Sequence, residues 1–421
     1  MTINEYLNYT CDYNTDLFSG RCVRIRKGEG RSLKAGGQWI YDNEIDSMDT
    51  GVENGDIVRV DDFDGYVMGY GAVSLHSRIR VRMLTRDRNE HITPAFIAGR
   101  VLDALEYRRA LGSIAPGGDY SSCRLIFGEA DLLPGITLDK FEDVLVIESM
   151  FFGLDRFREL ILSAVIRSLY EKEGLLIRGV YERSSGKARS LEGLPSFSGY
   201  LSEPFDTAVT VRENGLSYLA DVADGQKTGY FLDQKLNRLA IRPFCRGARV
   251  LDCFTHTGSF ALNAAAAGAR HVTAADISQS ALDIAAANAR LNGLEDRIDF
   301  FCTDVFSYLP ELVSAGEKYD VVILDPPAFT KARGTVQSAS RGYREINRRG
   351  ISLVRPGGFL ATATCSHFMD EEHFAKVIDI AAHDAHRRLK QIEKRAQAPD
   401  HPVLWGAGSS AYLQFYLFQV L

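Results

Sequence analysis

The sequence lacks several patterns that would assign it to a class at once. It contains no run of about 18 apolar residues, so no membrane-spanning helix is expected. Its seven cysteines form no C-x-x-C pair and show no regular spacing, which argues against a disulfide framework and a structural zinc site. The first six residues do not pair a basic segment with an apolar core, so no signal peptide is expected. The sequence therefore predicts a cytoplasmic protein with reduced thiols, no metal and no membrane partner.

A net positive charge is also missing. The chain carries a formal charge of −6, which by itself disfavours a nucleic-acid partner. Lys and Arg nevertheless concentrate in three short segments, at residues 21–34, 78–88 and 331–349. Such clusters can attract phosphate groups, although a solvated charged face explains any single one more simply. The third segment is the exception, because it directly follows the Asp325-Pro326-Pro327 turn.

The pattern of strands and helices divides the chain into four parts. Its 421 residues predict two or three domains. Residues 1–20 show no clear period and form an N-terminal extension, whereas residues 21–92 alternate short strands with turns, as a small β-barrel does. Residues 93–205 begin with a helix and continue as an α+β middle domain. Residues 206–421 begin with a hairpin and then alternate strands with helices, which predicts an α/β domain with a doubly wound, mostly parallel sheet.

Polar side chains follow the strands of this last domain where each strand ends. Ligands of a doubly wound sheet bind beyond the carboxyl ends of its strands. Five polar groups at one edge are hard to explain by packing alone. The residues expected at or just past those ends are Asp252, Asp276, Asp304, Asp325 and Cys365.

The first strand-to-helix turn of this domain points to the cofactor. It runs from Asp252 to Gly258 and holds one glycine, so it lacks the G-x-G-x-x-G pattern of a dinucleotide site. A turn with an acid and one glycine suits S-adenosylmethionine (SAM), with Asp252 facing its ammonium group. Asp276 is placed for the ribose hydroxyls and Asp304 for the adenine amino group. A single Asp after a strand is usually a cap or turn residue, but three in register favour a cofactor site.

Four motifs, in their order along the chain, resemble a known family. They are Gly229-Tyr230-Phe231-Leu232-Asp233-Gln234-x-x-Asn237-Arg238, Asp252-x-Phe254-x-x-x-Gly258, Asp325-Pro326-Pro327-Ala328-Phe329 and Thr364-Cys365-Ser366-His367. This set is similar to that of the bacterial large-subunit ribosomal RNA methyltransferases of type I, which make 5-methylcytosine. The resemblance covers nearly the whole chain, because 128–135 and 181–184 resemble that family's middle domain and 21–92 its N-terminal PUA RNA-binding domain. Residues 1–20 and the loose segment 36–40 depart from the family pattern.

The resemblance implies a class I, Rossmann-like methyltransferase fold with SAM as cofactor. It also implies large-subunit ribosomal RNA as partner and a cytosine as target. An N-terminal RNA module often accompanies self-association in such proteins, so a homodimer is possible, and the sequence leaves the choice between dimer and monomer open. The residues expected to bind the cofactor are Asp252, Phe254, Thr255, Gly258, Asp276, Asp304, Asp325, Tyr230, Gln234 and Arg238.

Cytosine C5 chemistry needs a nucleophile and a base-holding pocket. Cytosine C5 becomes nucleophilic when a thiolate adds to C6, and Cys365 fits that role. Asp325 fits the pocket that holds the flipped base by its N3–N4 edge; which group removes the C5 proton stays open. Phe329 is placed to stack on the base, with a core role as the alternative. The residues expected to contact the substrate are Pro326, Pro327, Phe329, Lys331 and Arg333.

Other assignments remain open at this point. His367 is expected to be held by nearby backbone rather than to activate the thiol, and His256 and Cys253 are expected to be loop and packing residues. An amino-group methyltransferase also uses Asp-Pro-Pro with an aromatic residue, but Ala328 and Cys365 favour C5 chemistry. A non-catalytic RNA-binding assembly factor is the second alternative. A nicotinamide dehydrogenase is disfavoured by the missing glycines.

Overall fold

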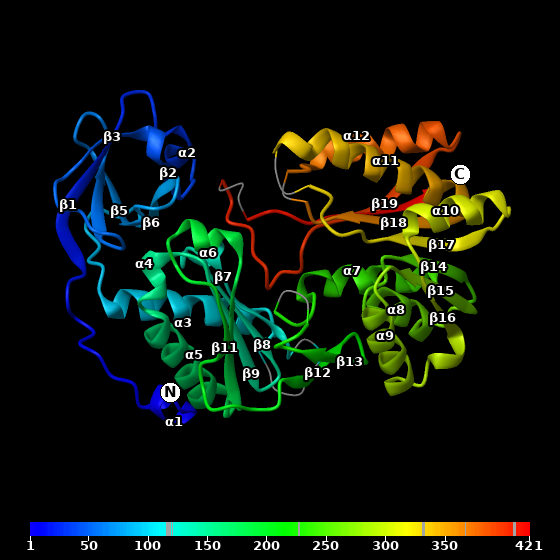
Figure 1. Cartoon of the computed structure of the whole chain (residues 1–421), viewed down its shortest axis with the longest axis horizontal. Helices are drawn as coiled ribbons and strands as arrows, with labels where there is room; N and C mark the ends of the chain where they lie inside the picture. The colour runs from blue at the N-terminus through cyan, green and yellow to red at the C-terminus, as the bar shows by residue number, and fades with distance from the viewer. Residues whose placement is uncertain (115–118, 120, 226–227, 331–332, 367, 407–409) are drawn as a thin grey trace. The chain divides into compact units, whose positions relative to one another are not determined.

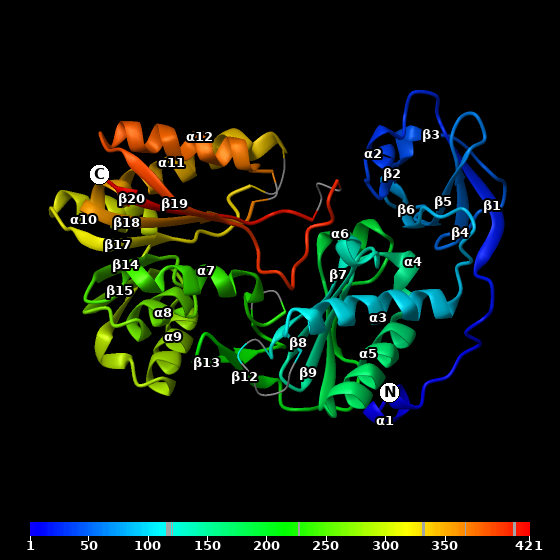
Figure 2. The same cartoon turned by 180° about the vertical axis from the view of Figure 1, so that it is seen from behind.

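The chain folds as two compact units in a computed structural model (Figures 1 and 2). The first unit comprises Met1–Val211, Ala220–Leu232 and Pro399–Ser410, and the second comprises Arg212–Leu219, Asp233–Ala398 and Ala411–Leu421. The structure describes residues 1–114, 119, 121–225, 228–330, 333–366, 368–406 and 410–421. Lys331 and His367, both singled out in the sequence, lie outside the described residues.

The N-terminal part of the first unit is a curled sheet of six strands (Figure 1). The strand order is β2-β6-β5-β4-β1-β3, and β1 runs parallel to β4 while the other neighbours are antiparallel. Alternating apolar residues point into one core, with Val23, Ile25 and Val81 almost fully buried. The elements are β1 (Phe18–Ile25), α2 (Arg31–Lys34), β2 (Trp39–Tyr41), β3 (Ile45–Met48), β4 (Ile57–Asp61), β5 (Val67–Val73) and β6 (Ile79–Thr85).

A second sheet in the first unit carries the order β11-β10-β9-β8-β7. The predicted helix after residue 93 is confirmed as α3. It begins there because Thr93 accepts a hydrogen bond from Phe96 N and Pro94 occupies the first turn. Helices α3 and α5 contact each other and contribute to the same core as the sheet. The elements are α3 (Pro94–Ala110), β7 (Cys123–Phe127), β8 (Ile136–Phe141), β9 (Val144–Ser149), α4 (Phe152–Asp155), α5 (Arg158–Glu173), β10 (Gly179–Ser184), α6 (Lys187–Leu191) and β11 (Phe197–Tyr200).

The N-terminal extension forms a short helix, α1 (Ile3–Leu7), that packs on α5. The Tyr6 ring is buried in the core of the second sheet, and the Ser163 hydroxyl donates to Tyr6 O at 2.5 Å. Arg167 Nη2 donates to Tyr9 O at 2.7 Å. Residues 3–9 are therefore an additional packed element and not a free tail.

The second unit is a doubly wound sheet of seven strands, which confirms the predicted α/β class. Its order is β16-β15-β14-β17-β18-β20-β19, with the first five strands parallel and β20 antiparallel to both neighbours. Helices α8 and α9 cover one face, and α11 and α12 cover the other (Figures 1 and 2). The strands are β14 (Arg249–Cys253), β15 (His271–Asp276), β16 (Ile298–Cys302), β17 (Tyr319–Leu324), β18 (Val354–Thr364), β19 (Leu389–Arg395) and β20 (Gln414–Val420).

The helices of this unit begin and end at residues that cap helices, as α9 shows. The Ser278 hydroxyl accepts from Ala281 N at the start of α9, and Gly293 follows its end with φ of 63°, so the predicted helix is confirmed. The helices are α7 (Lys235–Ala240), α8 (Ser259–Ala266), α9 (Gln279–Leu291), α10 (Val305–Ser314), α11 (Val336–Leu353) and α12 (Glu371–Asp384).

A hairpin, β12 (Ala208–Glu213) and β13 (Leu216–Asp221), forms a separate two-stranded sheet.

Strand register places the predicted site residues at one edge of the seven-stranded sheet. Cys253 in β14 pairs with Ala275 in β15 and with Leu324 in β17. Leu324 pairs with Thr362, so β18 extends two residues further before Cys365. Strands β14 and β17 are neighbours in the sheet but not in the chain, which is the switch point where such folds bind ligands.

Candidate active site

Asp252 is a buried carboxyl group at the end of β14. Its side chain is almost fully buried, and Oδ2 accepts from the Thr255 hydroxyl at 2.6 Å. Within the described part of the chain, Oδ1 has no hydrogen-bond partner, and neither does the buried hydroxyl of Thr257. The pKa of Asp252 is raised to about 7, chiefly by burial and in part by the nearby Asp325 and Asp276, while the hydrogen bond from Thr255 opposes the rise. A cationic or hydrogen-bonding ligand group would satisfy this carboxyl group.

The loop after Asp252 has an unusual backbone. Phe254 and His256 have φ of 63° and 52°, a region that costs a non-glycine residue on the order of 1–3 kcal/mol. Gly258 follows with φ of 82°, and a Cβ there would lie 2.8 Å from Leu262 Cδ1 and 3.1 Å from Ala285 Cβ. Such strain persists where the surrounding structure demands it, and ligand sites are common places for it.

Asp276, at the end of β15, holds this loop in place. Its Oδ2 accepts from His256 N and its Oδ1 from Ser278 N, both at 2.9 Å. Each carboxylate oxygen has a second lone pair, so ribose hydroxyls could still bind. Burial lowers the pKa of His256, and the charge of Arg238 lowers it further while Asp276 opposes both. The imidazole is therefore biased toward its neutral form.

Asp304 acts in the structure as the N-cap of α10. Its Oδ1 accepts from Phe306 N at 3.1 Å, and the residue is exposed. Helix capping was the simpler of the two interpretations of this residue, and the contact with an adenine amino group stays a prediction.

Asp325, directly after β17, is held by an amide chain. Gln234 Nε2 donates to Asp325 Oδ1 at 2.8 Å, and Asn237 Nδ2 donates to Gln234 Oε1 at 2.7 Å. Gln234 and Asn237 are buried, so this chain fixes the direction of the carboxylate. The structure thus connects the predicted Gln234 with the predicted Asp325.

Arg238 forms a buried ion pair with Glu213. Its Nη1 lies 2.7 Å from both carboxylate oxygens of Glu213, and both side chains are almost fully buried. The predicted cofactor contact of Arg238 would therefore share a guanidinium already engaged with Glu213. Tyr230 is buried and belongs to the first unit, so its predicted cofactor contact stays a prediction.

Cys365 follows the last residue of β18 and is half-buried. The residues on both sides of it bind one phenol, that of Tyr343 in α11. Thr364 Oγ1 donates to Tyr343 Oη at 2.7 Å, and Tyr343 Oη lies 2.9 Å from Ser366 Oγ. Ser366 N also donates to Thr364 Oγ1 at 3.2 Å, which closes a ring of hydrogen bonds around the thiol-bearing residue. Tyr343 is thus a site residue that the motifs did not indicate.

Phe329 packs among aromatic rings. Its ring centroid lies 4.5 Å from that of Tyr343 and 5.6 Å from that of Phe306. The ring is only half-buried, so the core and stacking interpretations both fit its position. Pro326 is buried and Pro327 exposed, and the side chain of Arg333 lies outside the described part of the structure.

The other two cysteines of this edge differ in exposure. Cys253 is fully buried, and burial raises its pKa well above the ordinary value, as suits a packing residue. Cys302 is exposed at the end of β16. Among the residues that the structure describes, no group of three His, Cys, Asp or Glu is placed to hold a metal ion.

The residues of this edge fit SAM as a cofactor. The unsatisfied Oδ1 of Asp252 suits an ammonium group, and the loop that follows Asp252 packs closely at Gly258. The single-glycine loop supplies no cradle for a pyrophosphate.

Comparison with known proteins agrees with this fit. A family model described as S-adenosylmethionine-dependent methyltransferase matches residues 193–416, and a model described as a PUA-like domain matches residues 23–86. A protein of Klebsiella pneumoniae named ribosomal RNA large subunit methyltransferase I is 38% identical over 409 residues, covering 97% of this chain and 100% of the relative. The chain belongs to the ribosomal RNA large subunit methyltransferase I family. It is accordingly a SAM-dependent methyltransferase with an N-terminal PUA-like domain.

Further members and folds extend the comparison. The Alteromonas mediterranea member of the family is 36% identical over 399 residues, covering 94% of this chain and 98% of the relative. A solved structure from Streptococcus mutans, described as a SAM-dependent methyltransferase, is 20% identical with a TM-score of 0.78, covering 94% of this chain and 99% of that one. A second solved methyltransferase, complexed with SAH, has a TM-score of 0.79 at 20% identity and the same coverage. These two structures share the fold over 94% of this chain. No helix in the described residues is both long and apolar enough to cross a membrane.

Proposed function

We propose that this methyltransferase transfers the SAM methyl group to C5 of a cytosine in large-subunit ribosomal RNA through a covalent bond between Cys365 and cytosine C6. The observation that carries the proposal is the position of Cys365 after β18 and Asp325 after the adjacent β17, at the edge that also holds the Asp252 loop. The relatives named as ribosomal RNA methyltransferases support the RNA substrate, and the PUA-like domain is in keeping with it.

The chemistry follows from these positions. SAM, when bound, supplies an electrophilic methyl group. The Cys365 thiolate adds to C6, and the electron pair of the C5–C6 double bond moves to C5. C5 would then bond to the methyl carbon while the bond between that carbon and the SAM sulfur breaks, so that S-adenosylhomocysteine is the leaving group. Asp325, oriented by Gln234, holds the N3–N4 edge of the flipped cytosine. A base removes the C5 proton, the C5–C6 double bond returns, and the thiolate leaves.

Some narrower assignments belong to the same proposal. Phe254, Thr255, Gly258 and Asp276 line the cofactor side, and Pro326, Pro327 and Phe329 line the substrate side. The division at residues 20, 92 and 205 is proposed as the functional division of the chain. A homodimer remains a prediction that sedimentation of the full chain would test.

The decisive test is methylation of ribosomal RNA by Cys365→Ala. Cys302→Ala is a matched control, because Cys302 is an exposed thiol at the end of another strand of the same sheet. We expect the first variant to lose 5-methylcytosine formation and the second to retain it, as measured by bisulfite sequencing of the reacted RNA. RNA carrying 5-fluorocytosine should form a denaturation-resistant adduct with the wild type and not with Cys365→Ala, because fluorine replaces the proton that must leave.

The remaining alternative gives a different result in the same assay. An amino-group methyltransferase would keep its activity in Cys365→Ala and would leave bisulfite protection unchanged. If every protected cytosine of the ribosomal RNA were equally protected from bisulfite in cells with and without the gene, the C5 proposal would be refuted.

A further inference from the structure

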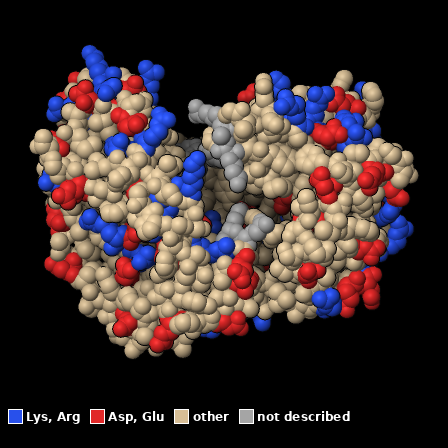
Figure 3. Space-filling model, in the orientation of Figure 1, with Lys and Arg blue, Asp and Glu red and all other residues tan. Residues whose placement is uncertain are grey.

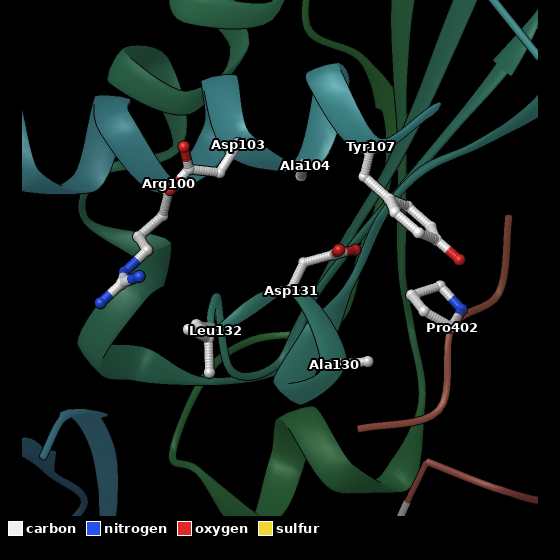
Figure 4. Close-up of a pocket in the computed structure, with 8 residues that line it drawn as sticks. All are labelled: Arg100, Asp103, Ala104, Tyr107, Ala130, Asp131, Leu132 and Pro402. Carbon is white, nitrogen blue, oxygen red and sulfur yellow. The ribbon is translucent and has the colours of Figure 1, made fainter. Parts of the chain in front are cut away.

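The connection between β19 and β20 carries a segment, Pro399–Ser410, that belongs to the first unit. Its start is anchored there by hydrogen bonds. Asp400 Oδ2 accepts from Arg124 N at 3.0 Å, and Asp400 O accepts from Arg108 Nη2 at 2.8 Å. Tyr107 Oη donates to Pro399 O at 2.9 Å. Figure 4 shows Tyr107 directed toward Pro402 of this segment, beside a pocket of about 260 Å³.

Two further contacts shape the segment. His401 is buried, and its ring centroid lies 5.5 Å from that of Phe127. Leu404 N donates to the hydroxyl of the buried Ser410 at 3.0 Å, which draws the two ends of the loop together. Residues 399–401 are therefore held in place on the first unit.

An exposed tryptophan, Trp405, lies further along this segment. Trp405 is 95% exposed, the largest exposed fraction among the large apolar side chains that the structure describes. The next residue, Gly406, packs against the turn after α2, because a Cβ on it would lie 2.8 Å from Ala35 O. The chain has two tryptophans, and the other, Trp39, donates to Glu129 Oε1 at 2.8 Å. The indole of Trp405 therefore offers a flat apolar face on which a planar group could stack.

The turn that Gly406 contacts lies beside exposed cations. Arg31 and Lys34 are exposed in α2, immediately before Ala35. Arg86 is exposed as well, and its Nη2 donates to Leu33 O at 2.6 Å, which brings its charge to the same helix. Glu29 is the single acidic residue in the segment 21–41. Lys and Arg side chains are visible over this part of the chain at the upper left of Figure 3.

We propose that Trp405, with Arg31, Lys34 and Arg86, is a docking surface for a single-stranded segment of the substrate RNA, in which one base stacks on the indole. Proteins bind single strands by combining cations that follow the phosphates with aromatic rings that stack on bases. A fully exposed indole next to three cations meets both requirements. The docked base is a different nucleotide from the reacting cytosine. The inference rests on the proposed function, since that function supplies RNA as the ligand.

Tryptophan fluorescence tests the stacking directly. Trp39→Phe leaves Trp405 as the sole tryptophan, and oligoadenylate is the probe because it contains no cytosine for the active site. We expect a saturable decrease of emission with oligoadenylate and little change with a blunt RNA duplex of equal length. In Trp405→Phe, where Trp39 remains, oligoadenylate should leave the emission unchanged. Equal quenching of both variants, or none in the first, would overturn the proposal.

Affinity for in vitro transcribed large-subunit RNA is the second measurement. We expect Trp405→Ala to bind about tenfold more weakly, whereas Trp405→Phe keeps most of the affinity. Tyr170→Ala is the matched control, because Tyr170 is an exposed aromatic residue on α5 of the same unit. Methylation by Trp405→Ala at saturating RNA should reach the wild-type kcat, with a raised KM. If Trp405→Ala bound RNA with unchanged affinity and still methylated it, the proposed docking surface would be refuted and the proposed function would not be affected. If the wild-type protein methylated no RNA, both the proposed function and the docking surface that rests on it would be refuted.

Discussion

The hydrogen-bond ring around Cys365 makes a quantitative prediction for Tyr343→Phe. The substitution keeps the aromatic ring, which packs on Phe329 with centroids 4.5 Å apart, and removes only the hydroxyl. Thr364 Oγ1 then loses its acceptor and Ser366 Oγ loses its partner, in a region where both residues are fully buried. An unsatisfied buried polar group costs about 1–3 kcal/mol. We therefore expect the free energy of unfolding to fall by about 2 kcal/mol.

The same substitution should slow methyl transfer. Residues 364 and 366 flank the nucleophile, so loss of their common partner lets Cys365 leave its attacking position. A loss of about 1.4 kcal/mol in positioning corresponds to a tenfold slower reaction, and we expect kcat to fall on the order of tenfold. The SAM dissociation constant should stay unchanged, because the cofactor residues belong to other strand ends. Urea unfolding, single-turnover methylation and calorimetry measure the three quantities.

Tyr218→Phe is a matched control for this experiment. Tyr218 is also fully buried in the second unit, and its hydroxyl accepts from Asn263 Nδ2 at 2.9 Å. Its removal should cost comparable stability but leave the single-turnover rate near that of the wild type. If Tyr343→Phe were destabilised and yet reacted at the wild-type rate, the phenol would only support the fold and the positioning argument would be refuted.

Three further outcomes are expected. Gly258→Ala should lower the free energy of unfolding by about 3 kcal/mol and weaken SAM binding, because the backbone at this position has a positive φ and the added Cβ would collide with Leu262 and Ala285. Calorimetry that showed normal SAM affinity would contradict this. SAM affinity should increase as the pH rises through about 7, because the bound ammonium favours ionised Asp252, and Asp252→Asn should remove that dependence; a parallel profile in the variant would exclude Asp252 as the responsive group. Tyr6→Ala should cost about 3 kcal/mol in urea unfolding without changing SAM affinity, and an unchanged midpoint would mean that α1 contributes no stability.

Much of the fold could be predicted because its signals are local. Ser278 and Gly293 mark both ends of α9, and the alternation of strands and helices is sufficient to predict a doubly wound sheet. In such a sheet the strand ends gather at one edge, so Asp252, Asp325 and Cys365 could be assigned to one site before any contact was known.

The remaining features depend on contacts between distant residues. Tyr343 lies in α11, away from every motif, and its role arises only when β18 brings Thr364 and Ser366 to its hydroxyl. Arg238 has Glu213 as a partner 25 positions away, on a hairpin strand. No pattern of residue types specifies such pairs, because the same residues would be ordinary surface charges if the chain folded otherwise.

The segment Pro399–Ser410 has a consequence for how this protein is made and divided. Strand β20 pairs with β18 and β19, yet it is translated only after the chain has left the second unit and returned. A nascent chain that ends before residue 411 therefore has no strand to join β19 to its sheet. A single cut cannot separate the units either, since the piece ending at residue 211 lacks part of its own packing surface. Dissection of this enzyme into independent modules would need circular permutation or co-expression of interleaved fragments.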